Sequence, residues 1–209
     1  MKNRINYIPF GLLGISFILM LAFVEKDQAE DPLTIGEKAP LTKKELKDVS
    51  GESIAINEVR GPNGLLVVFS CNTCPWVKKW EDRYNPIARK TKQRGIGMIA
   101  LNPNEDYRDN GDSFEDMVNR AKEKNYQFFY ALDKNHKLAD AFGATRTPEV
   151  FLFNKNMELV YHGAIDDNAN SADNVEEAYL ENALSNLASD KEINPNTTKS
   201  LGCSIKRTN

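Results

Sequence analysis

Cys71 and Cys74 stand two residues apart, directly after an apolar run and directly before a segment with helical spacing. The apolar run, residues 65–69, predicts a buried strand, and the residues that follow Pro75 predict a helix. Two thiols at such a turn can close a small disulfide ring. The first sulfur faces unpaired N–H groups at the positive end of the helix, which favour thiolate over thiol. Thiolate is the reactive form, so we expect Cys71 to attack and Cys74, as the more buried thiol, to resolve the mixed disulfide.

Two other uses of a CxxC pair are weaker. A structural zinc site needs four ligands, and beyond this pair the chain offers only Cys203 and the scattered His136 and His162. An inert disulfide is a poor explanation because closing so short a loop restrains little chain entropy. The pattern therefore predicts a redox-active pair without a metal or a cofactor.

The elements around the pair predict an α/β fold. Turn signals and short apolar pieces in residues 35–61 indicate an N-terminal hairpin. The unbroken apolar character of the strand before Cys71 indicates a strand that is covered on both faces, as in α/β sheets. Further strands are expected at 98–101, 128–130, 149–153 and 158–162. Helices are expected from Trp76 to about 94 with a kink at Pro86, from 112, from 133, and from Ser171 or Asp173 to about 187.

The first 30 residues differ from the rest. Lys2 and Arg4 precede an uncharged stretch, residues 8–24, as in a secretory signal or an uncleaved signal-anchor. No clear small-residue cleavage site follows, so a cleaved leader and a membrane anchor both remain open. We expect export to the periplasm or the outer face of the membrane, where disulfides persist. The predicted organisation is a leader and linker at 1–30, one domain at 31–190, and a tail at 191–209 that docks on the domain.

Composition excludes several functions. The chain is 41% hydrophobic and 27% charged, which is ordinary for a globular protein rather than a disordered one. The formal net charge is −3, and no basic face with interleaved aromatic residues is visible. Nucleic acid is therefore not an expected partner. The acidic residues Asp106, Asp109, Asp112 and Asp116 do not have calcium-loop spacing and are expected to be solvated.

Several segments together resemble a known family. The chain is similar to thioredoxin-like redoxins of the alkyl hydroperoxide reductase and thiol-specific antioxidant type. The resemblance covers roughly residues 35–206 and implies a central mixed β-sheet flanked by helices, with the hairpin as an N-terminal extension. It also implies a cis Thr147–Pro148 bond in a loop that faces the thiols and whose backbone can pair with a substrate strand. The segments that carry it are 63–69, 71–77, 143–150, 161–167 and 202–206.

The resemblance implies a thiol–disulfide oxidoreductase that acts outside the cytoplasm on protein disulfides or dithiols, or on small thiols. An upstream electron donor or acceptor would be its second partner. A peroxiredoxin-like peroxidase is the first alternative, in which Cys74 would be peroxidatic and Cys203 would capture its sulfenic acid. A non-enzymatic binding module on the same fold is the second alternative.

Accessory residues are less defined. The buried acid that thioredoxin has six residues before its first thiol is Leu65 here, so Glu149 or Glu105 is a candidate proton acceptor. Trp76 either covers the thiols or belongs to the core, and Arg146 either approaches the thiolate or is a surface charge. Cys203 either resolves a bond to the pair, with Cα atoms under about 7 Å apart, or is a semi-buried apolar residue.

Overall fold

The computed structural model describes residues 31–208 of the 209-residue chain. The predictions of a signal peptide or membrane anchor fall on residues 1–30 and lie outside the described residues. Within residues 31–208, no helix has both the length and the apolar character needed to cross a membrane.

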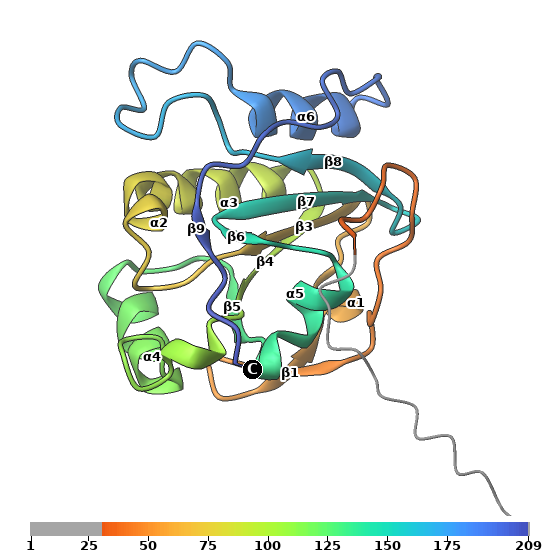
Figure 1. Ribbon diagram of the computed structural model, residues 1–209. Helices are drawn as coiled ribbons and strands as arrows, with labels where there is room; N and C mark the ends of the chain where they lie inside the picture. The colour runs from red at the N-terminus through yellow and green to blue at the C-terminus, as the bar shows by residue number, and fades with distance from the viewer. Residues whose placement is uncertain (1–30, 209) are drawn as a thin grey trace, which may run out of the picture.

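The predicted mixed sheet flanked by helices is confirmed (Figure 1). One ribbon has the strand order β2-β1-β5-β4 and the other has the order β3-β7-β8, and they meet where β3 lies beside β4. β4 and β5 are parallel, whereas β3, β7 and β8 pair antiparallel. The strands of the sheet are β1 (Glu45–Asp48), β2 (Ser53–Ala55), β3 (Gly64–Phe69), β4 (Ile96–Asn102), β5 (Phe129–Leu132), β7 (Glu149–Asn154) and β8 (Leu159–Gly163).

A short second sheet lies outside the central one. It consists of β6 (Arg146–Thr147) and β9 (Cys203–Ser204), which pair antiparallel. The helices are α1 (Ile56–Val59), α2 (Pro75–Trp80), α3 (Tyr84–Gln93), α4 (Phe114–Glu123), α5 (Lys137–Ala141) and α6 (Tyr179–Ala188), with 3₁₀ turns at η1 (Glu81–Arg83), η2 (Glu105–Tyr107) and η3 (Lys134–His136).

Two helix boundaries differ from the sequence-based expectation. The break after Pro75 comes at η1 and not at Pro86, which lies in the first turn of α3, where a missing N–H costs little. The last helix begins at Tyr179 rather than near Ser171. The side-chain oxygen of Asn168 accepts the backbone N–H groups of Asn170 and Ser171, so the chain turns there instead of entering a helix.

β3 separates two hydrophobic clusters. Successive side chains of a strand point to opposite faces, so Leu66 and Val68 join one cluster while Leu65, Val67 and Phe69 join the other. The first cluster also receives residues of α2, α3 and α6, and the second receives residues of α1 and α5. β3 is therefore covered on both faces, as its unbroken apolar sequence predicted.

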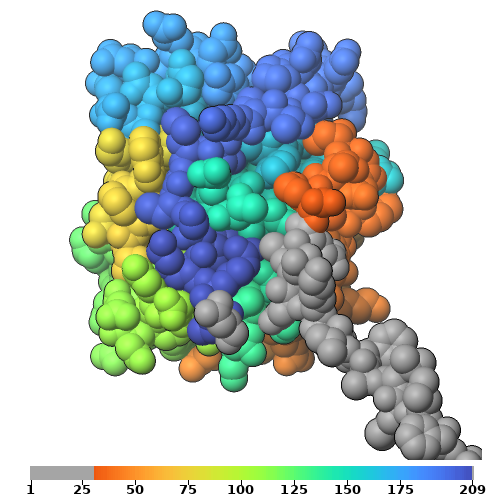
Figure 2. Space-filling model, viewed as in Figure 1, coloured from red at the N-terminus to blue at the C-terminus, as the bar shows by residue number. Residues whose placement is uncertain are grey.

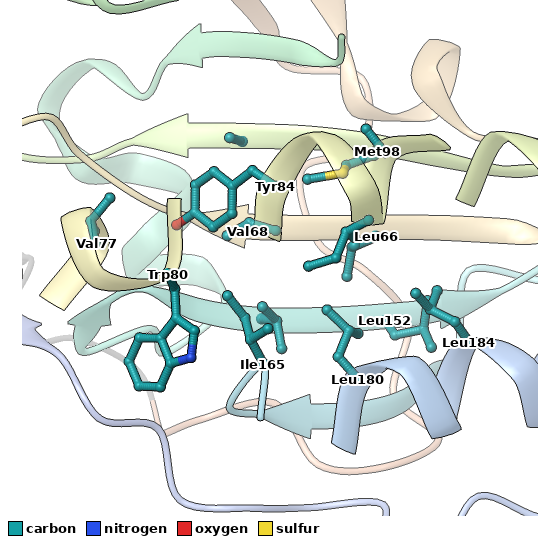
Figure 3. Close-up of a cluster of buried hydrophobic side chains, with 14 of the residues drawn as sticks. Leu66, Val68, Val77, Trp80, Tyr84, Met98, Leu152, Ile165, Leu180 and Leu184 are labelled. Atoms are coloured by element: carbon teal, nitrogen blue, oxygen red, sulfur yellow. The ribbon is translucent and has the colours of Figure 1, made fainter. Parts of the chain in front are cut away.

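α6 is attached to the sheet through the first cluster. Leu180 and Leu184 are almost fully buried and lie with Leu152 of β7 and Ile165 in the same group of side chains (Figure 3). Trp80 and Tyr84 fill the part of this cluster beneath α2 and α3. The cluster thus holds the CxxC helix and the last helix against one face of the sheet.

Replacing Leu184 with alanine should lower the free energy of unfolding by about 2–5 kcal/mol, because a fully buried leucine leaves a cavity when it is truncated. Chemical denaturation of the purified protein measures this change. Leu41→Ala, at a side chain that is 47% exposed, is the matched control and should cost well under about 1 kcal/mol. Equal losses for the two variants would contradict this description of the core.

Candidate redox site

The two thiols of the CxxC segment follow β3 and lie where α2 begins. Cys74 is the N-cap residue of α2, and Pro75 occupies the first helical position, where its missing N–H is tolerated. Both cysteines are buried, with 2% of Cys71 and 4% of Cys74 exposed. The expectation that Cys71 lies nearer to solvent than Cys74 is therefore wrong, since β3 and the first hydrophobic cluster enclose both.

The disulfide in the structure joins Cys74 to Cys203, and Cys71 is a free thiol. The Cα atoms of the bonded pair are 6.1 Å apart across a sequence separation of 129 residues. The small Cys71–Cys74 ring expected from the sequence is thus not formed in this state. Of the two expectations for Cys203, the structure places it within bonding reach of the pair.

The two sulfurs converge on one residue of the facing loop. Cys71 Sγ lies 3.3 Å from Thr147 Oγ1, and Cys74 Sγ lies 3.2 Å from the Thr147 carbonyl oxygen. The peptide bond between Thr147 and Pro148 is cis. Thr147 and Pro148 are both buried, so this loop closes over the thiols from the opposite side of the site.

The pKa of the Cys71 thiol is raised, chiefly because burial penalises the charged thiolate and secondly because Asp112 is negatively charged. Hydrogen bonds from the Thr147 hydroxyl and from the backbone of Cys74 and Thr73 act in the opposite direction and only partly compensate. The expectation of a stabilised thiolate at a helix terminus is therefore not met in this state. Burial outweighs the amide dipoles of a helix that has only six residues.

Asp112 is the residue of the site that the sequence did not reveal. It was expected to be solvated, but its side chain is fully buried. One oxygen accepts the Asn72 backbone N–H at 2.7 Å and the Asn102 amide at 2.9 Å. The other accepts the Thr73 hydroxyl at 2.7 Å and the Asn104 amide at 3.0 Å. Four donors thus compensate a buried carboxylate, which in turn fixes the two residues between the thiols.

A second set of hydrogen bonds holds Asn72. Its side chain donates to the Gly111 carbonyl and accepts the hydroxyl of Tyr130, which also accepts the Asn102 amide. Asn102 is the last residue of β4, and Asn104 follows two residues later. The signal that could have identified this network is the position of these asparagines at the end of a strand, where α/β folds gather polar site residues.

Glu149 is buried rather than solvated. Its carboxylate accepts the backbone N–H groups of Thr145 and Arg146 at 2.8 and 3.0 Å, and its other oxygen lies 2.8 Å from His162 Nε2. These bonds fix the loop just before Thr147. His162 thus pairs with Glu149 and not with Asp166, which the sequence had placed near it, because the antiparallel β7–β8 pairing brings their strands together.

The remaining candidates lie around the site in different roles. Arg146 is exposed and contributes backbone to β6. Trp76 is half-buried and packs on the first hydrophobic cluster beside Trp80, whose indole N–H donates to Asp166 at 2.8 Å. Glu105 binds Arg108 and accepts the Asn135 N–H, in the loop after β4.

No metal site is apparent among residues 31–208: the described part of the chain contains no cluster of three or more His, Cys, Asp or Glu side chains placed to hold an ion. The site consists instead of three cysteines, a loop with a cis proline and a buried carboxylate. This arrangement defines a thioredoxin-like redox protein.

The comparisons give the family. Residues 35–162 match the AhpC/TSA family, and the chain belongs to it. Thiol-disulfide oxidoreductase ResA of Bacillus cereus is 24% identical over 163 residues, which is 76% of this chain and 87% of that protein. The prediction of a redox enzyme of the thioredoxin-like redoxin type is therefore confirmed.

Solved structures agree with this fold. A hypothetical protein of Sinorhizobium meliloti 1021 is 29% identical, with a TM-score of 0.77 over 85% of this chain and 97% of that one. The thioredoxin domain of a thiol-disulfide oxidoreductase from Bacteroides vulgatus is 19% identical, with a TM-score of 0.52 over 62% of this chain and 88% of that one. The second likeness is evidence for the fold alone.

Asp112→Asn should lower the pKa of Cys71, because it removes the negative charge that opposes the thiolate. The alkylation rate of Cys71 by iodoacetamide, followed by mass spectrometry as a function of pH, should reach its midpoint at lower pH. The same change replaces an acceptor by an amide among four donors and should destabilise the fold by about 1–3 kcal/mol.

Asp109→Asn is the control, since Asp109 is exposed in the same loop. It should leave both the alkylation profile and the stability unchanged. An Asp112→Asn profile identical to that of the wild type would mean that Asp112 does not act electrostatically on Cys71.

Proposed function

We propose that this protein is a thiol–disulfide oxidoreductase that uses Cys71 and Cys74 on the disulfides or dithiols of other proteins. The observation that carries the proposal is the convergence of both sulfurs on Thr147, the residue before the cis proline. A partner strand that pairs with this loop would bring its own sulfur to the thiols. The name of the ResA relatives supports the same activity.

The exchange requires no cofactor. In the reducing direction, Cys71 thiolate attacks one sulfur of a partner disulfide, and the other partner sulfur leaves with the electron pair and takes a proton. Cys74 thiolate then attacks Cys71 Sγ, forms the Cys71–Cys74 bond and releases the partner's first sulfur as a thiol. The partner gains two electrons, and a dithiol donor must return them to the enzyme. The reverse sequence oxidises a partner dithiol.

We place this activity outside the cytoplasm, with residues 8–24 as a leader or membrane anchor. The uncharged stretch behind Lys2 and Arg4 supports export. A disulfide between Cys74 and Cys203 is also a state that persists in oxidising compartments. Cell fractionation of the full chain tests this location, and recovery in the cytoplasm would refute it.

Cys71→Ser and Cys74→Ser should each lower the reduction of a protein disulfide substrate such as insulin, in the presence of dithiothreitol, on the order of a hundredfold or more. Cys71→Ser removes the nucleophile, and Cys74→Ser should in addition accumulate a mixed disulfide at Cys71 that mass spectrometry detects. Thr73→Ser is the control, since it keeps the hydroxyl that donates to Asp112. Full turnover without both cysteines would favour a non-enzymatic binding module.

The Cys74–Cys203 bond favours a second candidate, a thiol peroxidase. In that reaction Cys74 thiolate attacks a hydroperoxide, becomes a sulfenic acid and releases an alcohol or water. Cys203 thiol then condenses with the sulfenic acid, which forms the Cys74–Cys203 disulfide and releases water. The same bond also forms by thiol–disulfide exchange, so the product does not distinguish the two routes.

Cys71→Ser separates the two functions. A peroxidase that relies on Cys74 and Cys203 should consume peroxide at an unchanged rate after this substitution, whereas the oxidoreductase should lose its turnover. We expect peroxide consumption to be slow in the wild type, because Cys74 is only 4% exposed. Rapid consumption by the Cys71→Ser protein, followed with a ferric–xylenol orange assay, would favour the peroxidase instead.

A further inference from the structure

The C-terminal segment, residues 196–207, crosses the face of the molecule that carries the thiols. Figure 2 shows it in dark blue between the yellow region of α2 and the teal residues of the loop before β7. Figure 1 shows β9 of this segment beside β6 and close to α2. In this state the segment covers the redox site.

The segment pairs with the loop as a strand. β9 lies antiparallel to β6, with Thr147 opposite Cys203 and Arg146 opposite Ser204. The Ile205 N–H continues the pairing by donating to the Thr145 carbonyl at 3.1 Å. The segment therefore uses the backbone edge directly before the cis proline, and it presents a cysteine at the position that faces Cys74.

The approach is too close for most side chains. A Cβ atom added at Gly202 would lie 2.5 Å from the Thr147 carbonyl oxygen and 3.2 Å from Arg146 Cβ. The first of these neighbours is backbone, which the buried Thr147 holds in place. The residue before the paired cysteine is therefore restricted to glycine in this geometry.

Contacts on both sides of β9 hold the segment in register. On one side, Thr198 N–H donates to the His162 carbonyl at 3.0 Å, and its hydroxyl accepts the Ala164 N–H at 2.9 Å. On the other side, Ile205 is buried in the second hydrophobic cluster, and Arg207 binds the Asp140 carboxylate at 2.8 Å. These non-covalent contacts position Cys203 independently of the disulfide.

We propose that residues 196–207 are an internal substrate strand and that Cys203 is a third redox-active cysteine of this enzyme. The Cys74–Cys203 disulfide is then the closed form, in which the segment occupies the place of an external partner. This inference rests on the proposed oxidoreductase activity and adds its regulation and its substrate class. Cys203 is half-buried, whereas Cys71 and Cys74 are buried, so the segment is the part of the site that meets an incoming partner.

Opening needs no external oxidant or reductant in its first step. Cys71 loses its proton and its sulfur attacks Cys74 Sγ, so that the Cys71–Cys74 bond forms and the Cys74–Cys203 bond breaks. The electron pair leaves on Cys203 Sγ, which takes up a proton, and the number of disulfides is unchanged. The segment is then held only by its strand pairing and its flanking contacts, and an external strand can displace it.

The same geometry describes the external substrate. It is an extended polypeptide that pairs antiparallel with residues 145–147 and carries a cysteine preceded by glycine. A bulky residue before the cysteine would meet the Thr147 carbonyl, as a Cβ at Gly202 would. The site is thus predicted to read one small residue as well as a sulfur.

Two full-length variants test the closed form. Cys203→Ser keeps the strand and removes the bond, whereas Gly202→Val keeps the thiol and removes the strand pairing. After reduction and reoxidation with one equivalent of glutathione disulfide, peptide mapping should find Cys74–Cys203 in the wild type and Cys71–Cys74 in both variants. Lys199→Val, at an exposed position of the same segment, is the control and should behave as the wild type.

The same proteins should differ in turnover. Insulin reduction should be several-fold faster in Gly202→Val than in the wild type, because the internal strand no longer competes with the substrate. Cys203→Ser should lie between them, since serine still pairs. Wild-type rates and Cys74–Cys203 mapping in Gly202→Val, or loss of activity in Cys203→Ser, would overturn the proposal.

A peptide series tests the substrate class. Peptides with the sequence of residues 198–207, activated at their cysteine with thionitrobenzoate, report attack by the reduced enzyme through release of the chromophore. The glycine peptide should react at least roughly tenfold faster than the peptide with valine at that position, after correction for their rates with glutathione. Equal corrected rates would refute selection by strand pairing.

These outcomes remain separate from those of the proposed function. If Cys71→Ser retains wild-type turnover on insulin, the oxidoreductase proposal itself fails. If Cys71→Ser is inactive but Gly202→Val and Cys203→Ser both match the wild type, the oxidoreductase stands and the internal substrate strand is refuted.

Discussion

The contact between the CxxC turn and the Thr147–Pro148 loop is the constraint on which the rest of this structure depends. Both sulfurs lie within 3.3 Å of atoms of Thr147, although 73 or more residues separate them from it in the chain. Three structures are needed to hold this contact. β3 and β7 pair antiparallel and bring the two segments to the same end of the sheet, α2 fixes Cys74, and Glu149 fixes the loop through two backbone N–H groups.

Burial gives this contact its chemical character. The thiol of Cys71 is enclosed and its pKa is raised, so the closed state holds an unreactive thiol rather than an exposed nucleophile. Asp112 contributes in two ways that oppose each other functionally. Its four hydrogen bonds fix the residues between the thiols, while its charge disfavours the Cys71 thiolate. A state in which Cys71 attacks must therefore differ from this one in solvation, and removal of the covering segment supplies that difference.

The covering segment combines recognition and covalent chemistry in one short strand. Backbone pairing with β6, a glycine in close contact with Thr147 and a cysteine within bonding reach of Cys74 occur on consecutive residues. Such a strand competes with external partners at an effective concentration that no free partner reaches, because it belongs to the same chain. The enzyme would then respond to partners that attack or displace the strand and remain closed to others.

The sequence alone predicted the strand–turn–helix that carries Cys71 and Cys74, the hairpin before it and the mixed sheet around it. These are local features, since apolar runs, turn residues and helical spacing within about 20 residues determine them. The loop with Thr147 and Pro148 was located through its resemblance to a family. The start of α6 was missed because the side chain of Asn168 turns the chain where periodicity alone favoured a helix.

Only the tertiary structure decided which thiols meet and what surrounds them. The Cys74–Cys203 pairing spans 129 residues, and no local pattern encodes a contact of that range. The same holds for Asp112, whose sequence position indicated a solvated loop, but whose neighbours Asn102 and Asn104 bury and compensate its charge. Residue type and spacing therefore determined the kind of chemistry, whereas burial and long-range pairing decided which cysteine is bonded, which is free and how reactive the free thiol is.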